Sequence, residues 1–447
     1  MEMRLIKSRS NSKATGAAML YPVSVTVSSA DTSLSFDTDE SYTLSTSKEG
    51  AKLEATSVFG ALRGIETFRQ LVKRHLFSVD VNCSVSISDS PRFAVRGLLI
   101  DTARHFLPIS LILENLDLME MNKLNVLHWH VVDDQSFPFE SDFAEHLSEG
   151  AFSPSLRFSK ENVKKVIDEA YVRGIIVMPE FDTPGHTLSW GKGYPSLLTS
   201  CSDGSFGPFN PLNEDLYPFM QGFLQEVVDT FPTSYIHLGG DEVSFDCWES
   251  NDNITAWMKQ QGWTNYAKLE GYYVQKIVDI VEKTLKHKYL VWQEVFNNNI
   301  TLSSDAVVDV WKGTDWATLS AVTEKGYKAV FSGGYYLDHL NTSPDFFDGW
   351  EFYATDPQGF NGTQAQKDLV IGGKAAMWGE HVDVTNFIPR VWPRTSCVGE
   401  RLWSAADVTD QADAEVRLHE FRCGQVAMGF NVEPLGPGSF CDIAGYA

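Results

Sequence analysis

Beyond Pro91 the chain alternates between short apolar runs and amphipathic stretches, and this pattern repeats about eight times. Runs that are apolar throughout are typical of buried parallel strands, and the amphipathic stretches have the period of helices that cover such a sheet. The pattern therefore predicts a (β/α)8 TIM barrel with insertions. The expected strands span residues 95–101, 126–133, 175–182, 235–242, 289–296, 306–311, 328–336 and 369–380, with helices at 110–121, 160–173 and 266–286.

The residues before Pro91 have a different pattern. Strand-like alternation from Tyr21 to about Val58 is followed by a helical pattern over 58–73 and a second alternating piece over 79–87, which predicts a small α/β domain. Asp89-Ser90-Pro91 interrupts the chain and is a natural boundary. We expect a disordered or processed leader over 1–19, an N-terminal domain over 20–90, and a catalytic barrel with a C-terminal tail over 91–447.

Composition narrows the classes of function. The chain has 36 Lys and Arg against 59 Asp and Glu, so 36 − 59 gives a formal charge of −23. Such an acidic surface repels phosphate backbones and anionic lipids, which disfavours nucleic-acid and membrane partners. No run approaches the roughly 18 apolar residues that a membrane-spanning helix needs.

Two features favour the secretory pathway, although the N-terminus lacks the apolar core of a signal peptide. Loss of a leader would reconcile these features with such an N-terminus. Cysteines are the first feature, because Cys201, Cys247, Cys423 and Cys441 flank loops or a chain end where bridges would be useful, although six cysteines allow 15 pairings. Sequons are the second feature, and five predict N-glycosylation at Asn82, Asn253, Asn299, Asn341 and Asn361.

Most of the expected barrel strands end in acidic, His, Trp or Tyr residues. Barrel enzymes build their sites at the carboxyl ends of the strands, so these side chains should meet in one pocket. A pocket of carboxylates and aromatic rings suits a sugar, whose hydroxyls need acceptors and whose C–H faces stack on rings.

The segment HLGGDE, residues 237–242, is the sharpest motif. Its two glycines let the backbone turn tightly, and Asp241 and Glu242 then put two carboxylates at the strand mouth, one of which could stay protonated as a general acid. A solvated acidic loop is the plain alternative, and the apolar run before the motif weakens it.

Other polar positions leave alternatives open. Arg104 could bind two sugar hydroxyls or form a structural salt bridge with Asp101. His128 and His130 form a His-x-His pair that could hold a metal, but the later strands lack further His ligands, so hydrogen-bonded barrel-interior residues are the better interpretation. His186 could reach a carboxylate of the neighbouring fourth strand or brace its own loop.

With these residues in place, the sequence strongly resembles the β-N-acetylhexosaminidases of glycoside hydrolase family 20, above all the lysosomal and secreted eukaryotic enzymes with a β-type subunit. The resemblance runs from about Tyr42 to the end of the chain. It is carried by RGLLIDTARHFLP, NKLNVLHWHVVDDQSFPFES, MPEFDTPGHTLSWG, HLGGDEVSFDCW, VWQEVF, AAMWGE and GERLWS.

The resemblance implies a retaining mechanism in which the substrate's own 2-acetamido oxygen attacks the anomeric carbon. It assigns Glu242 as general acid and base, Asp241 as the acceptor of the acetamido N–H, and Tyr336 as the donor to the acetamido oxygen. It also implies that His186, with Asp133 behind it, tunes Glu242. Substrate binding would fall to Arg104 at the C3 and C4 hydroxyls, Asp338 and Glu380 near C4 and C6, and the walls Trp292, Trp311 and Trp378.

The same resemblance supports the bridges Cys201–Cys247 and Cys423–Cys441 and implies a homodimer. The chain departs from the family pattern at two places in GGYYLD. Tyr335 stands where a Trp is common, which we interpret as a changed pocket edge. Asp338 and His339 stand where the animal α-type subunit has an Asn-Arg pair, so we expect neutral terminal GlcNAc and GalNAc to be preferred over anionic sugars.

The resulting hypothesis is an exo-β-N-acetylhexosaminidase without metal or organic cofactor that acts on glycans or glycoconjugates in a lysosome, another acidic vacuole or outside the cell. One rival is a two-carboxylate retaining glycosidase that uses Glu242 with Glu380 or Glu294. A metal-dependent deacetylase of amino sugars and a sugar-binding protein without turnover are further alternatives.

Overall fold

The computed structural model describes residues 2–3, 21–74, 79–82, 84–339 and 347–442. Eight parallel strands close into a barrel, in the order β10-β13-β14-β15-β16-β17-β8-β9, which confirms the predicted TIM barrel. The strands are β8 (Val95–Asp101), β9 (Val126–Val132), β10 (Ile176–Phe181), β13 (Tyr235–His237), β14 (Lys288–Trp292), β15 (Val307–Val310), β16 (Lys328–Phe331) and β17 (Val370–Met377).

Several expected strands were drawn too long at their carboxyl ends. β13 ends at His237, where the glycines of HLGGDE leave the sheet, and β16 ends at Phe331. The residues after β14 form the short helix α9 (Gln293–Asn297) and not the end of a strand. The strand ladder ends where the chain turns away from the sheet. The polar residues expected at the strand ends therefore lie on loops and at helix starts above the barrel.

Helices and short strands connect and cover the barrel. The expected helices are found as α2 (Ile109–Met121), α3 (Lys160–Val172) and α8 (Ala267–Asp279). The other elements of the barrel part are η1 (Glu145–Gly150), α4 (Trp190–Gly193), η2 (Pro195–Leu197), β11 (Leu198–Ser200), β12 (Phe206–Phe209), α5 (Leu216–Thr230), α6 (Asp246–Ser250), α7 (Asp252–Gln260), η3 (Ile280–Thr284), α10 (Trp316–Glu324), α11 (Gly349–Ala354), α12 (Gln364–Asp368), α13 (Phe387–Val391), α14 (Arg394–Trp403) and α15 (Gln411–Ala427).

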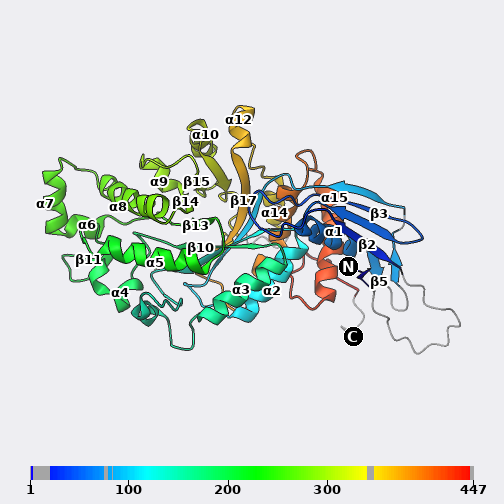
Figure 1. The fold of residues 1–447 in the computed structure, drawn as a ribbon, viewed down its shortest axis with the longest axis horizontal. Coiled ribbons are helices and arrows are strands. Elements are labelled where there is room, and N and C mark those ends of the chain that lie inside the picture. The colour runs from blue at the N-terminus through cyan, green and yellow to red at the C-terminus, as the bar shows by residue number, and fades with distance from the viewer. Residues whose placement is uncertain (1, 4–20, 75–78, 83, 340–346, 443–447) are drawn as a thin grey trace.

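A small α/β unit precedes the barrel. Its five-stranded sheet has the order β1-β2-β4-β3-β7, and a separate two-stranded sheet pairs β5 with β6. Figure 1 shows the small sheet in blue beside α1 and α15, at the end of the molecule opposite α6 and α7. The elements are β1 (Glu2–Met3), β2 (Val23–Val27), β3 (Tyr42–Thr46), β4 (Ala51–Ala55), α1 (Val58–Gln70), β5 (Val72–Arg74), β6 (Val79–Val81) and β7 (Ser86–Asp89).

The small unit and the barrel share buried contacts. Trp403 of α14 lies in the same hydrophobic cluster as Leu44 and Leu53 of the small sheet. Beside it, the buried Glu40 carboxylate accepts from Arg63 of α1 at 2.7 Å and from Arg96 of β8 at 2.5 Å. One carboxylate therefore connects the helix of the small unit to the base of the barrel.

The barrel interior is built in layers. Alternate residues of a strand point inward, and the inward positions nearest the amino ends form an apolar cluster from seven strands. Its buried members are Val95, Val126, Met178, Tyr235, Leu290, Val307 and Val330. Above this floor the inward residues are charged, and above those lies an aromatic cluster that contains Trp292, Tyr336 and Trp378. The apolar floor seals one end of the barrel and leaves the other end to polar side chains.

We predict that Glu40→Ala destabilises the fold by about 3–5 kcal/mol, because it leaves two buried guanidinium groups without their counter-charge. Chemical denaturation of wild type and variant measures this loss. Glu49→Ala, on an exposed loop, serves as the control and should unfold like the wild type; an equal loss in both variants would contradict the role of Glu40.

Candidate active site

The Asp241–Glu242 pair lies on a tight turn after β13. Gly239 and Gly240 have φ of +71° and +93°, and Glu242 itself has φ of +50°. A side chain at Gly239 would overlap the Asp182 carboxylate, and the Gly240 N–H donates to that carboxylate at 2.7 Å. The turn gives the two acids different surroundings: Asp241 is only 8% exposed, whereas the Glu242 side chain is 57% exposed.

Three buried polar atoms converge beside Asp241. His186 Nε2 lies 4.0 Å from a carboxylate oxygen of Asp241 and 4.0 Å from one of Asp182, and it is 3.9 Å from Glu242 Oε2. His186 Nε2, Asp241 Oδ1 and Asp182 Oδ2 have no hydrogen-bond partner among the residues that the structure describes. Burial raises the pKa of Asp241 and, with the nearby Asp241 charge, raises that of Asp182 well above its ordinary value. Such unpaired groups suit a site that a ligand completes.

His186 is held by Asp133. Its Nδ1 lies 3.2 Å from Asp133 Oδ1. Burial opposes the charged ring, but the Asp133 hydrogen bond and the Asp182 and Asp241 charges outweigh it and raise the pKa of His186 to about 10. His186 is thus an imidazolium beside Glu242 and Asp241, so the structure brings together all the predicted members of this group.

Arg104 forms the structural salt bridge considered from the sequence, and its sugar-binding role stays a prediction. It pairs with Asp101 at 2.9 Å, which is the structural salt bridge, and with Asp133 at 2.9 Å. Its guanidinium also lies over the Trp378 ring, with 5.1 Å to the ring centroid, and 4.0 Å from Glu380. The side chain is 12% exposed, so the fork is fixed by two carboxylates while its outer edge faces the pocket.

The predicted aromatic walls form one cluster. Trp311 and Tyr336 stack with 5.8 Å between ring centroids, and Trp292 lies 6.1 Å from Trp378 and 6.4 Å from Trp311. Two indole N–H groups are anchored from behind: Trp292 donates to Glu180 at 2.7 Å and Trp311 to Glu294 at 2.9 Å. The rings therefore present fixed faces, as stacking against the C–H face of a sugar requires.

Asp338 and Glu380 complete the rim. Tyr336 forms a bridge to Ala376 of β17, which brings Asp338 close to the same strand end as Glu380. Asp338 Oδ1 is buried and has no hydrogen-bond partner in the described part of the chain, and burial raises the pKa of this carboxyl. The Glu380 side chain is 51% exposed. Both acids offer free acceptor atoms towards the pocket.

Tyr335 is not at the pocket edge, so that expectation was wrong. Its side chain is fully buried, its hydroxyl donates to the Thr355 carbonyl at 2.8 Å, and its ring packs against Phe331 and Phe352. After a strand ends, alternation no longer determines which way a side chain points. The turn in which the Tyr335 N–H donates to Ser332 directs Tyr335 outward and Tyr336 inward.

His128 and His130 lie inside the barrel, as expected. Both contact the Glu180 carboxylate, at 2.9 and 2.8 Å. His128, His237 and Asp309 lie close enough together to hold a metal ion. However, the Lys374 ammonium already lies against His128 Nδ1 and 2.5 Å from Asp309. A cation there would face an ammonium group, so this donor set does not fit a metal.

The sequence did not predict the roles of Glu180 and Asp182, and it offered Glu294 only as the second carboxylate of the two-carboxylate alternative. Their partners come from other strands, so no local spacing reveals them. The parallel register pairs Glu180 with both His130 and His237, and only closure of the barrel brings Trp292 to the same carboxylate.

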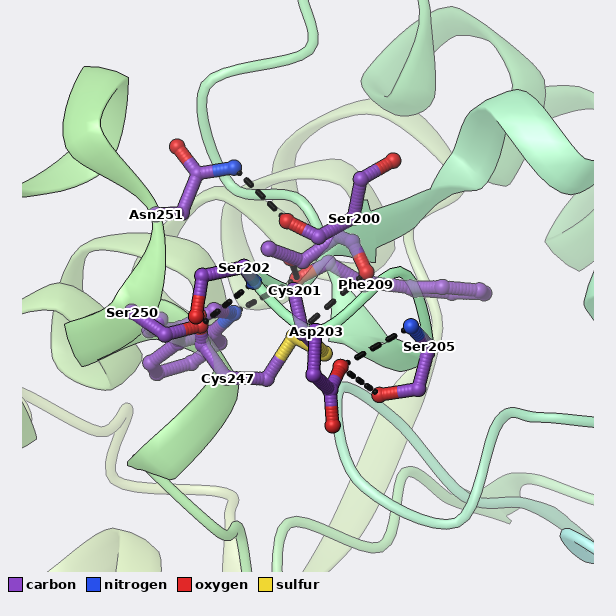
Figure 2. The surroundings of a disulfide bond; sticks show 11 residues. Ser200, Cys201, Ser202, Asp203, Ser205, Phe209, Cys247, Ser250 and Asn251 are labelled. Carbon is purple, nitrogen blue, oxygen red and sulfur yellow. Dashed lines mark hydrogen bonds between the residues drawn. A yellow bond between two sulfur atoms is a disulfide. The ribbon is translucent and has the colours of Figure 1, made fainter.

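The predicted Cys201–Cys247 bridge is present and lies close in sequence to the Asp241–Glu242 turn. It joins the loop between β11 and β12 to α6, which begins four residues after Glu242. Figure 2 shows two further ties around it: Asn251 donates to the Ser200 carbonyl at 2.9 Å, and Ser202 N–H donates to Ser250 at 3.1 Å. These contacts hold the segment that follows Glu242.

The remaining covalent predictions have mixed outcomes. The Cys423–Cys441 bridge is present and ties α15 to the chain that follows it. Cys397 is a buried free thiol, and Cys83 and Asn341 lie outside the described residues. The other four sequon asparagines, Asn82, Asn253, Asn299 and Asn361, are exposed.

Comparisons with known proteins agree with this geometry. The family model described as the catalytic domain of glycosyl hydrolase family 20 matches residues 93–406, and one described as beta-acetyl hexosaminidase like matches residues 3–71. The chain is 48% identical to the human beta-hexosaminidase subunit beta, covering 94% of this chain and 76% of that protein. It is 45% identical to the rat subunit alpha, covering 94% and 81%.

Solved structures show the same likeness. The chitobiase of Flavobacterium johnsoniae superposes with a TM-score of 0.79 at 32% identity, covering 87% of this chain; the chain spans 60% of the length of that enzyme. The exo beta-N-acetylglucosaminidase of Vibrio harveyi, solved with N-acetylglucosamine, gives a TM-score of 0.80 at 26% identity, covering 92% of this chain and 69% of that one.

We predict a pH-dependent stability that arises from Glu270 of α8, which is buried with its Oε1 unpartnered and faces Asn298, Glu294 and Asp241. Burial raises the pKa of Glu270 to about 7. Because the pKa of Glu270 is higher in the folded than in the unfolded state, protonated Glu270 favours the fold. This contribution to the free energy of unfolding is fully present below the pKa of Glu270 in the unfolded chain, and it is lost as the pH rises through about 7. The loss by pH 9 is on the order of 3 kcal/mol.

Glu270→Gln should remove this loss, so that denaturation curves of the variant and the wild type agree near pH 5 and the variant is more stable at pH 9. Exposed Glu249→Gln is the control. A wild-type loss that the Glu270 variant retains in full would refute the assignment.

Proposed function

The chain belongs to glycosyl hydrolase family 20, and on that premise we propose that it is an exo-β-N-acetylhexosaminidase whose machinery is the group of residues described above. It removes terminal, β-linked N-acetylglucosamine or N-acetylgalactosamine from the non-reducing end of glycans and glycoconjugates. The observation that carries the proposal is the Asp241–Glu242 turn, which sets a buried carboxylate beside an open one under a cluster of three tryptophans and a tyrosine.

The reaction uses the substrate's own acetamido group as nucleophile. Its carbonyl oxygen attacks the anomeric carbon while Glu242 donates a proton to the departing glycosidic oxygen, so the C1–O bond breaks as the oxazolinium ring closes. Glu242, now ionised, then removes a proton from water that attacks the same carbon. The ring reopens, and the configuration at C1 is retained.

The contrast between the two acids supports these roles. Glu242 is open to the glycosidic oxygen and to water. Asp241 is buried and accepts the acetamido N–H. Its interaction with the substrate is most favourable when the oxazolinium charge develops, because opposite charges interact strongly where water is excluded. The His186 imidazolium, fixed by Asp133, lies between the two acids and adjusts their protonation.

The aromatic walls and the acidic rim determine which sugar the site binds. Tyr336 donates to the acetamido oxygen, and Trp292, Trp311 and Trp378 enclose the acetamido methyl and the ring. Arg104 binds the C3 and C4 hydroxyls with the donors that Asp101 and Asp133 leave free, and Asp338 and Glu380 accept from the C4 and C6 hydroxyls.

We also propose a setting for the enzyme. Two disulfides and four exposed sequon asparagines suit a lysosome, another acidic vacuole or the outside of the cell. No helix among the described residues is long and apolar enough to cross a membrane. The relatives are named as subunits, which supports an assembly of more than one chain, and we propose a homodimer. We keep 20–90 and 91–447 as the proposed limits of the two domains, whereas the separate leader over 1–19 is not kept, because Glu2–Met3 pair with β2 in the small sheet.

We predict that Asp241→Asn and Glu242→Gln each lower kcat for the 4-nitrophenyl β-glycoside of N-acetylglucosamine by at least about 100-fold. The plain β-glucoside, which lacks the internal nucleophile, should not be cleaved by any variant. Glu380→Gln separates the two-carboxylate alternative: it should raise KM and keep most of kcat, whereas loss of kcat together with cleavage of the glucoside would favour a carboxylate nucleophile.

Substrate charge gives a second prediction, because Asp338 and Glu380 put two carboxylates near the C6 position. The wild type should prefer the neutral sugar over its 6-sulfated form. Asp338→Asn removes one repulsive charge and should raise kcat/KM for the sulfated substrate relative to the neutral one by about 10-fold. Equal cleavage of both substrates by the wild type would contradict the assignment.

A further inference from the structure

Glu180 lies inside the barrel in contact with four side chains. It is fully buried and accepts one hydrogen bond on each oxygen. Oε1 accepts from the Trp292 indole at 2.7 Å and lies 3.3 Å from His237 Nδ1. Oε2 lies 2.8 Å from His130 Nδ1 and 2.9 Å from His128 Nε2.

The contact with His130 continues to the substrate side of the pocket. His130 Nε2 lies 2.8 Å from Asp133 Oδ2, and that same oxygen is 2.9 Å from an Arg104 nitrogen. The other oxygen of Asp133 lies 3.2 Å from His186. A single chain of contacts therefore runs from Glu180 through one imidazole to Asp133, which orients both Arg104 and His186.

Cationic and anionic side chains alternate along this chain of contacts. Burial opposes the imidazolium, but Glu180 and Asp133 outweigh it and raise the pKa of His130 to about 10. His128, beside the Lys374 ammonium, has its pKa lowered by burial to about 3. A charged His130 then donates to Glu180, which stays ionised, while a neutral His128 lies 2.9 Å from the same carboxylate.

We propose that Glu180 is a positioning residue that aligns two separate parts of the substrate pocket: the Trp292 wall directly, and the Arg104 and His186 side chains through His130 and Asp133. The inference rests on the proposed function. Glu180 itself lies beneath the aromatic cluster and touches no substrate. A carboxylate of purely structural value would stabilise the barrel but leave selectivity unchanged.

The proposal predicts a selective defect in Glu180→Gln. The amide oxygen still accepts from Trp292, but the negative charge that holds the His130 imidazolium is gone, so Asp133 and Arg104 lose their fixed geometry. We expect kcat/KM for the N-acetylglucosaminide to fall by about 10- to 100-fold, as is usual when a partner behind a contacting group is removed. Preference for this substrate over its 4-deoxy analogue should shrink as well, because Arg104 would no longer grip the C4 hydroxyl.

The matched control is Glu40→Gln, another buried glutamate between two cationic side chains, but at the base of the barrel. It should lower the melting temperature and keep kcat/KM and the 4-deoxy selectivity of the wild type. If Glu180→Gln folds and keeps the kcat/KM and the 4-deoxy selectivity of the wild type, the positioning role of Glu180 is contradicted. Should it fail to fold, His130→Gln decides the matter, because it breaks the same chain and must reduce the same selectivity.

The test also separates this inference from the function beneath it. A wild type that does not cleave the N-acetylglucosaminide contradicts the proposed function. A wild type that cleaves it, with Glu180→Gln and His130→Gln both retaining wild-type selectivity, contradicts only the role of Glu180.

Discussion

Every charge inside this barrel must be paired with another, because the apolar floor seals one end and the aromatic cluster covers the other. An ionised group without a partner there would cost several kcal/mol. Lys374 therefore lies against Asp309, and Glu180 against two histidines. Gly97 makes room for this layer, since a Cβ at that position would come within 2.8 Å of the Lys374 side chain.

The paired layer explains why the pocket above it can be rigid and yet polar. Side chains that bind sugar hydroxyls need free donors and acceptors, and flexible ones would lose much of their binding energy when they become ordered. Here Arg104 is fixed by Asp101 and Asp133, and the two indoles are fixed by Glu180 and Glu294. Arg104, Trp292 and Trp311 are thus each held from behind by an acid.

Much of this could be read from the sequence, for identifiable reasons. Apolar runs and their polar ends predict the strands and the end of the barrel at which the site lies, because periodicity and strand polarity are local properties, whereas the roles of the site residues are implied by the family resemblance. The network of Asp309 and Lys374 could not be predicted, since each sits within an apolar run and its partner is set by register and barrel closure. Tyr335 was misplaced for a similar reason: the turn after β16, and not strand alternation, sets its direction.

The central claim is that the substrate's acetamido oxygen is the nucleophile. The most direct measurement compares kcat for N-acetylglucosaminides whose acetyl methyl carries zero, one, two or three fluorines. Fluorine withdraws electrons from the carbonyl oxygen, so the account predicts a steep and continuous fall in kcat along the series. A rate that is independent of fluorination would show that a protein carboxylate makes the attack, and would contradict the account.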